Sequence, residues 1–209
     1  MRLAPGAVTG FADVTGIVLA AGSGSRMGTP KALVSTAGEP WVAIAARLLL
    51  DAGCARVVVV LGASAEAARP LVPVDAAIRA VTNDGWRTGM ASSLRTGLEA
   101  ASGDAAMITV VDTPGLPLAA ARRVLATGAP LARAVFGGRP GHPVLMRRDH
   151  WAAAAASIAG DHGARAYLDA HGVVDVECGD LYDGHDVDTP TSELRGGRPV
   201  VERGPAGLA

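Results

Sequence analysis

Residues 16–31 read GIVLAAGSGSRMGTPK, an apolar run that gives way to glycine, serine and two cations. The apolar part predicts a buried strand over Ile17–Ala21, followed by a loop at its carboxyl end. Because glycine permits positive φ and close approach, backbone N–H groups in such a loop can contact a polyphosphate. Arg26 and Lys31 are placed to neutralise the phosphate charge. We therefore predict a nucleotide phosphate site here, with a simple turn as the alternative.

The glycine spacing of this loop excludes two common phosphate-binding motifs. The sequence GxxxxGK[ST] cannot be aligned to it, so it is not a P-loop. Gly22, Gly24 and Gly28 form the pattern GxGxxxG, which is longer than the dinucleotide-binding fingerprint. If the loop binds a nucleotide, it does so through a motif other than these two.

Composition narrows the class of protein. A chain of 209 residues with 49% hydrophobic and 3% aromatic residues suits one α/β domain, with helices packed closely on a parallel sheet. The formal charge of −1 argues against a nucleic-acid partner. Cys54 and Cys178 fit no metal spacing, which favours a reduced cytoplasmic setting. The longest apolar stretch, Trp41–Leu50, is short and contains Arg47, so we expect no membrane partner.

Strands and helices alternate along the first half of the chain. Strands are expected at 56–61, 78–82 and 105–111, and helices at 41–52, from 65 to a stop at Pro70, and at 89–101. Such alternation predicts right-handed crossovers and an open twisted sheet. The expected fold class is therefore α/β.

The second half has a different pattern. Strands are expected at 131–136, 144–147 and 173–176, helices at 149–159 and 161–171, a connecting loop at 137–143, and a terminal helix starting at 186–190. We expect residues 1–12 to form a flexible leader, 13–195 a single domain, and 196–209 a flexible tail. No internal repeat is present.

Three features fall at the carboxyl ends of predicted strands, where open α/β sheets bind ligands. They are the loop at 22–31, Asn83 and Asp112. A carboxylate facing a triphosphate-binding loop suggests Mg²⁺, which is usually held by one or two carboxylates and substrate phosphates. The alternative for Asp112 is that it caps a helix begun by Thr113-Pro114.

Four further side chains are candidates. Asp188 lies two residues after Asp186, so an extended segment would place both carboxylates on one side, although helix capping before Pro190 is the alternative. His142, between glycine and proline in the expected loop, is a candidate substrate contact or a structural histidine. Ser92 and Ser93 would either cap a helix or contact a ligand at its N-terminus. No Ser–His–Asp arrangement and no Cys–His zinc pattern is present.

A family resemblance covers residues 16–195. The motifs that carry it are LAAGSGSRMGTPKAL (19–33), VTNDGWRTGMASSLRTGL (81–98), VDTPGLP (111–117), GRPGHPVLMRR (138–148), GDHGARAYL (160–168) and DVDTPTSEL (186–194). In order and spacing they resemble the MobA-like nucleotidyltransferases and, more narrowly, molybdenum cofactor cytidylyltransferase. The resemblance implies a three-layer Rossmann-like open sheet, the nucleotide-diphospho-sugar transferase fold.

The resemblance also implies roles for particular residues. Leu19, Ala20, Ala21, Gly22 and Gly24 would surround the base and ribose. Arg26 and Lys31 would bind the triphosphate, and Asp112 and Asp188 would bind Mg²⁺.

Two positions bear on substrate choice. Ala21 stands where guanylyltransferase relatives more often have a second glycine, which favours CTP over GTP. Thr113 departs from the Gln or Met common between Asp and Pro in the family, which bears on the acceptor.

The implied reaction transfers CMP from CTP to the terminal phosphate of molybdopterin and releases pyrophosphate. The product would pass to a molybdoenzyme or its maturation chaperone. The alternatives are a guanylyl- or cytidylyltransferase acting on another phosphorylated small molecule, and a non-catalytic molybdenum cofactor carrier. A nicotinamide-dependent oxidoreductase is disfavoured by the glycine spacing.

Overall fold

The structure is a computed structural model that describes residues 10–25, 27–160, 163–184 and 201–202. Its main sheet contains the strands β1 (Val14–Ala20), β4 (Arg56–Leu61), β5 (Ile78–Thr82), β6 (Ala105–Val110), β7 (Leu131–Phe136), β8 (Arg139–Arg147) and β9 (Val174–Glu177). The strand order is β5-β4-β1-β6-β8-β7-β9. β1 is parallel to both of its neighbours, β4 and β6, and therefore lies in the interior of the sheet.

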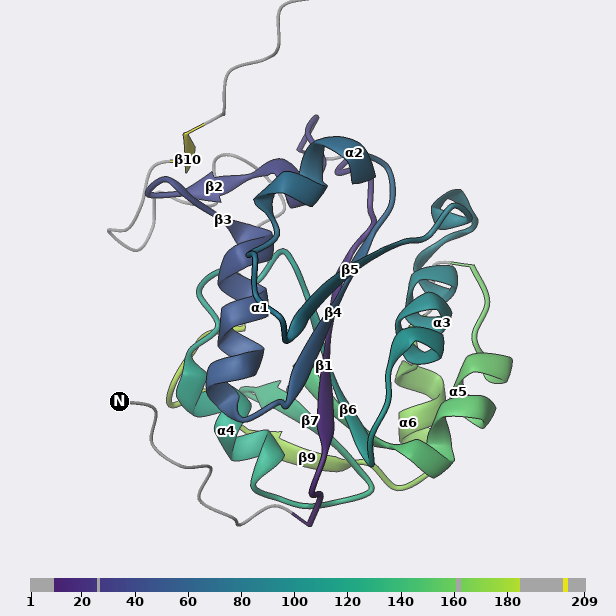
Figure 1. Cartoon of the computed structure of the whole chain (residues 1–209). Coiled ribbons are helices and arrows are strands. Elements are labelled where there is room, and N and C mark those ends of the chain that lie inside the picture. The colour runs from purple at the N-terminus through teal and green to yellow at the C-terminus, as the bar shows by residue number, and fades with distance from the viewer. Residues whose placement is uncertain (1–9, 26, 161–162, 185–200, 203–209) are drawn as a thin grey trace, which may run out of the picture.

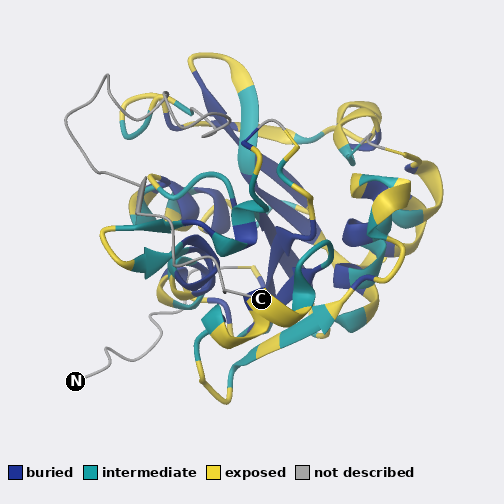
Figure 2. Cartoon of the chain, turned by 90° about the horizontal axis from the view of Figure 1, so that it is seen from above, coloured by how far each residue is buried: buried dark blue, intermediate teal, exposed yellow. Residues whose placement is uncertain are grey.

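Helices cover both faces of this sheet and give a three-layer α/β architecture (Figure 1). They are α1 (Trp41–Ala52), α2 (Ala65–Ala68), α3 (Met90–Ala100), α4 (Leu118–Leu125), α5 (Trp151–Ser157) and α6 (Arg165–Ala170). One hydrophobic core joins the sheet to α1 and α4, and a second joins it to α3, α5 and α6. Figure 2 shows the buried strands enclosed between these layers. No helix in the described ranges is long and apolar enough to cross a membrane.

A small second sheet lies beside the main one. It consists of β2 (Ser35–Thr36), β3 (Glu39–Pro40) and β10 (Val201–Glu202), in the order β10-β2-β3. β10 pairs antiparallel with β2. Two residues of the expected tail at 196–209 therefore form a strand.

Several elements have the bounds that the sequence predicts. Helix α1 spans Trp41–Ala52 and ends before Gly53, whose φ of 120° is one that glycine adopts without strain. The continuous run Arg56–Leu61 forms β4, which is buried almost throughout because strands pack on both of its edges and helices on both of its faces. Ile78–Thr82 and Leu131–Phe136 likewise form β5 and β7.

The loop expected at 137–143 is wrong, and the sheet that composition predicted to be parallel is mixed. β8 begins at Arg139 and runs antiparallel to both β6 and β7. The turn between β7 and β8 therefore contains only Gly137 and Gly138, both with positive φ (58° and 75°). The three backbone N–H groups of Gly137, Gly138 and Gly179 bond the Glu177 carboxylate, which holds its pKa below the usual range.

The helices of the second half are shorter than expected. The chain before α5 forms a 3₁₀ turn at Arg148–His150, and α6 starts only at Arg165. The sequence did not predict α4. The α-helix α2 ends at Ala68, before Pro70 as expected, and a 3₁₀ turn at Arg69–Leu71 follows it directly.

Alternation along β1 decides which side chains can reach each face. Val18 and Ala20 belong to the core under α1 and α4, whereas Ile17, Leu19 and Ala21 face α3. The residues after β1 that point toward α3 are therefore the ones that can line a site there.

Replacing Gly16 with alanine is expected to destabilise the fold by about 1–3 kcal/mol, because β1 and α1 approach closely at this position. A Cβ atom there would lie 2.9 Å from Leu49 Cβ and 3.0 Å from Val57 Cγ2. Urea unfolding would measure the loss. Gly22→Ala is the control, because a Cβ at Gly22 meets nothing within 4 Å. Equal stability of the two variants would contradict the packing argument.

Candidate functional site

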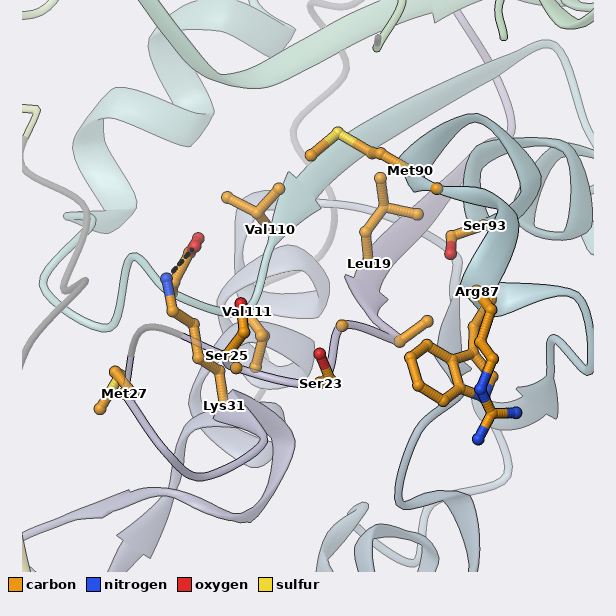
Figure 3. Close-up of a pocket in the computed structure, with 16 residues that line it drawn as sticks. Leu19, Ser23, Ser25, Met27, Lys31, Arg87, Met90, Ser93, Val110 and Val111 are labelled. Carbon is orange, nitrogen blue, oxygen red and sulfur yellow. Dashed lines mark hydrogen bonds and ion pairs between the residues drawn. The ribbon is translucent and has the colours of Figure 1, made fainter. Parts of the chain in front are cut away.

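A pocket of about 500 Å³ opens at the carboxyl ends of β1 and β6, beside the start of α3 (Figure 3). Its lining comes from the glycine-rich loop, the loop before α3 and the end of β6. The lining residues are Leu19, Ala21, Gly22, Ser23, Gly24, Ser25, Met27, Lys31, Trp86, Arg87, Gly89, Met90, Ser93, Val110, Val111 and Asp112. The pocket is thus at the sheet edge where α/β folds bind ligands.

The glycine-rich loop holds its shape through Gly24. The φ of Gly24 is 62°, and a Cβ atom there would lie 2.0 Å from the carbonyl oxygen of Thr29, so no other residue fits. The Gly24 carbonyl accepts a hydrogen bond from the Met27 N–H at 2.9 Å. These contacts fold the loop back toward Lys31, which begins the 3₁₀ turn Lys31–Leu33.

Lys31 and Asp112 meet at one end of the pocket. The Lys31 Nζ lies 2.7 Å from Asp112 Oδ2, and the two side chains are 15% and 22% exposed. An ion pair shielded to this degree is stronger than one on the surface, because less water screens it. The glycine-rich loop and the end of β6 are therefore joined through a charged contact.

The other oxygen of this carboxylate fits a cation. Asp112 is one of the residues that line the pocket. Its Oδ1 is buried and has no hydrogen-bond partner among the described residues. A buried carboxylate oxygen without a partner is costly, and a hard cation such as Mg²⁺ or Mn²⁺ would satisfy it. The described ranges hold no group of three His, Cys, Asp or Glu side chains around a metal position. Further oxygen ligands would then come from water or substrate.

The helix-capping alternative for Asp112 is wrong. Helix α4 begins at Leu118 with Pro117 at its N-cap position, five residues beyond the carboxylate. Asp112 instead lies in the loop directly after β6. Its side chain is positioned by the strand and contacts Lys31.

A different set of side chains forms the opposite end of the pocket. The Arg87 guanidinium stacks on the Trp86 ring, with Cζ 4.4 Å from the ring centroid. Figure 3 shows Arg87 and Ser93 on one side of Leu19, and the Lys31 contact on the other. The pocket therefore has one end with a shielded ion pair and one end with an aromatic ring, a guanidinium and a hydroxyl.

Asn83 supports this second end from outside the pocket. Its Nδ2 donates to Ser92 Oγ at 2.8 Å and to Ser93 Oγ at 3.0 Å, and its Oδ1 accepts from the Gly85 N–H at 3.0 Å. Asn83 is buried, and neither it nor Ser92 lines the pocket. The structure thus brings Asn83, Ser92 and Ser93 together, but only Ser93 faces the cavity.

The remaining predicted residues divide into two groups. Leu19, Ala21, Gly22 and Gly24 line the pocket, whereas Ala20 faces the opposite core because it follows Leu19 on a strand.

His142 lies within β8 and not in a loop. Its Nδ1 is 3.4 Å from the Ile108 carbonyl oxygen on the neighbouring strand β6, and it does not line the pocket. The loop placement of His142 was therefore wrong. Arg26 and Asp188 lie outside the described residues.

Sequence reasoning missed several lining residues. Trp86 and Arg87 are the largest of them. A signal was present, because Trp86 follows Asn-Asp-Gly directly after a strand, and a large aromatic residue in a polar loop at this sheet edge indicates a ligand contact.

This fold and this pocket define an α/β protein with a ligand-binding pocket at the carboxyl edge of its parallel strands. Residues 16–176 match the MobA-like NTP transferase domain. The chain belongs to that family.

The relatives of this chain differ in name. A protein of Paenarthrobacter nicotinovorans named nicotine blue oxidoreductase is 37% identical over 189 residues, covering 84% of this chain and 92% of the relative. The crystal structure of Rv0371c from Mycobacterium tuberculosis is 25% identical, covers 85% of this chain and 93% of its own, and has a TM-score of 0.72. A manganese complex of Rv0371c has a TM-score of 0.66, at 22% identity and with 80% and 89% of the two chains covered.

A nucleotidyl transferase from a Methanothermobacter species shares the fold, with a TM-score of 0.75. It is 22% identical and covers 88% of this chain and 95% of its own. The seven-stranded mixed sheet is thus the nucleotidyltransferase fold that the resemblance implied.

Proposed function

We propose that the protein transfers CMP from CTP to the terminal phosphate of molybdopterin and releases pyrophosphate. The observation that carries the proposal is that the two ends of the pocket differ in chemistry. Lys31 and Asp112 lie at one end, and Trp86, Arg87 and Ser93 lie at the other. A nucleoside triphosphate also has two different ends, because its phosphates are far from its base. The triphosphate would lie at the Lys31 end and the base near Ser93.

The reaction is a displacement at phosphorus. An oxygen of the acceptor phosphate attacks the α-phosphorus of CTP, the bond from that phosphorus to the bridging oxygen breaks, and pyrophosphate leaves with that electron pair. The acceptor oxygen is already anionic, so no protein nucleophile is required. The chain's residues bind and orient the two phosphates and stabilise the charge that develops between them.

Lys31 and Asp112 would contribute most to binding the phosphates and stabilising their charge. Lys31 would move its ammonium group from Asp112 to the β- and γ-phosphates when the nucleotide binds. Asp112, together with Asp188 and phosphate oxygens, would hold Mg²⁺, which supplies Lewis-acid stabilisation of the phosphoryl charge. The unpartnered Asp112 Oδ1 supports this role, and Rv0371c was crystallised as a manganese complex. Arg26 would add a second positive charge on the triphosphate.

The preference for CTP over GTP rests on Ala21, and the choice of molybdopterin rests on the family resemblance. Cys54 and Cys178 are both buried and free. We include a cytoplasmic location in the proposal because reduced thiols are typical there.

The experiment that tests the proposal is pyrophosphate release with each of the four NTPs, Mg²⁺ and molybdopterin that carries its metal. Release with CTP that depends strictly on the pterin is the expected result. Release with GTP would contradict the base assignment and keep the family chemistry. Tight CTP binding without release would contradict the acceptor, and a panel of sugar, polyol and acid phosphates would then identify it.

A second candidate function is reduction of a dye-like acceptor by a nicotinamide cofactor. The relative from Paenarthrobacter, at 37% identity over 189 residues, favours it by its name. A hydride would pass from the cofactor to the acceptor, and a proton from solvent would complete the reduction. Loss of NAD(P)H absorbance in the presence of nicotine blue, without any NTP, would support this candidate. A thermal shift with CTP–Mg²⁺ and none with NAD would oppose it.

A further inference from the structure

The Ser93 hydroxyl accepts a hydrogen bond from the described residues but donates none to them. Ser93 lies in the first turns of α3, is 5% exposed and lines the pocket. Its Oγ accepts a hydrogen bond from Asn83 Nδ2 at 3.0 Å. The serine proton has no acceptor among the described residues. The Ser93 hydroxyl therefore accepts a hydrogen bond from the protein, and its proton is available to donate to a ligand in the pocket.

Asn83 fixes that direction because its amide cannot be reversed. The Gly85 N–H is a donor only, and it bonds Asn83 Oδ1 at 3.0 Å. The NH₂ group must therefore be the one that faces the two serines. Asn83 is 5% exposed, so water does not compete for these bonds.

Ser92 provides a comparison within the same network. It accepts from the same Asn83 NH₂ group at 2.8 Å, but its own proton has protein acceptors in the carbonyls of Gly85 at 3.1 Å and Gly89 at 2.8 Å. Ser92 does not line the pocket. Of the two serines, only Ser93 presents a donor to the cavity.

We infer that the Ser93 hydroxyl recognises the nucleobase by donating a hydrogen bond to it. Asn83 is the positioning residue, because its donation to Ser93 Oγ leaves the serine proton available for the base. The inference rests on the proposed function, since it places the base at the Ser93 end. Cytosine presents a ring acceptor at N3, where uracil presents an N–H donor. The Ser93 proton therefore bonds cytosine N3. The uracil N3–H can only donate to the Ser93 oxygen, which leaves the serine proton without an acceptor among the described residues and weakens the binding of uracil. The site thereby selects cytosine between the two pyrimidines.

The test is calorimetric binding of CTP and UTP, with Mg²⁺ and without acceptor, to the full-length chain and its variants. The wild-type protein is expected to bind CTP about tenfold more tightly than UTP, the size of one well-made neutral hydrogen bond. In Asn83→Asp, the carboxylate still accepts from the Gly85 N–H but also accepts from Ser93. The Ser93 proton then turns away from the pocket, and the preference for CTP is expected to fall by about tenfold.

Two more variants keep the test decisive if Asn83→Asp disturbs the loop. Ser93→Ala removes the donor and is expected to abolish the CTP preference while binding both nucleotides. Ser92→Ala is the matched control and should keep the preference, because its hydroxyl donates to the protein. A purely structural role for Asn83 would weaken both nucleotides equally and leave their ratio unchanged.

The outcomes separate this inference from the proposed function. Equal wild-type affinity for CTP and UTP, or a ratio that Ser93→Ala leaves intact, overturns the inference, even if CTP still releases pyrophosphate. Binding of neither nucleotide overturns the proposed function and the inference together.

Discussion

Replacing Lys31 with alanine is expected to slow pyrophosphate release by about 10²–10³-fold, the usual effect of losing one preorganised charge-stabilising group. Lys31 is 15% exposed and lies 2.7 Å from Asp112, so the pocket already holds its charge where phosphates would bind. Water cannot replace the ammonium group well in so shielded a position. Single-turnover kinetics with saturating CTP would measure the loss in the chemical step.

The matched control for Lys31 is Arg47→Ala. Arg47 is an exposed cation on α1 that pairs with Glu39 outside the pocket. Its removal should leave turnover within about twofold, since exposed ion pairs contribute little free energy. Near-normal turnover of Lys31→Ala would remove this lysine from the mechanism.

Asp112→Ala is expected to abolish most pyrophosphate release and to weaken Mn²⁺ binding in the presence of CTP. The variant removes both the oxygen that bonds Lys31 and the buried oxygen that has no partner in the described chain. A hard cation would lose its carboxylate ligand, and the ion pair between Lys31 and Asp112 would be lost. Electron paramagnetic resonance of Mn²⁺ measures the metal directly, so the result does not depend on turnover.

Asp112→Asn separates charge from shape, because the amide has the same size. We expect it to behave like Asp112→Ala toward Mn²⁺, since a neutral amide is a poorer ligand than a carboxylate. The control is Asp51→Asn, an exposed carboxylate at the end of α1. Wild-type Mn²⁺ affinity in both Asp112 variants would show that the cation binds elsewhere.

Local sequence predicted the elements that carry the site. The run Arg56–Leu61 had to be a central strand, because it contains four consecutive valines followed by a leucine. Helix α1 was bounded by Pro40 and Gly53. Since these signals lie within the element itself, they do not depend on what the element later packs against.

The antiparallel direction of β8 was not predictable in the same way. Gly137 and Gly138 suit a tight turn, yet the composition of the stretch to Pro143 is equally typical of a loop. What made it a strand is its pairing with β6 and β7. His142 was consequently expected in a loop at the site and lies instead in the sheet.

The sequence by itself determined a buried strand followed by a glycine-rich loop that contains Lys31, and a later strand that ends just before Asp112. Only the tertiary structure decided that these two residues, 81 positions apart, form an ion pair. It likewise decided that Asn83 donates to both Ser92 and Ser93, and that of these two serines only Ser93 lines the pocket. Propensity and hydrophobic period are local properties of the chain. Hydrogen-bond partners are chosen by which elements the folded core brings together, and no local pattern records that choice.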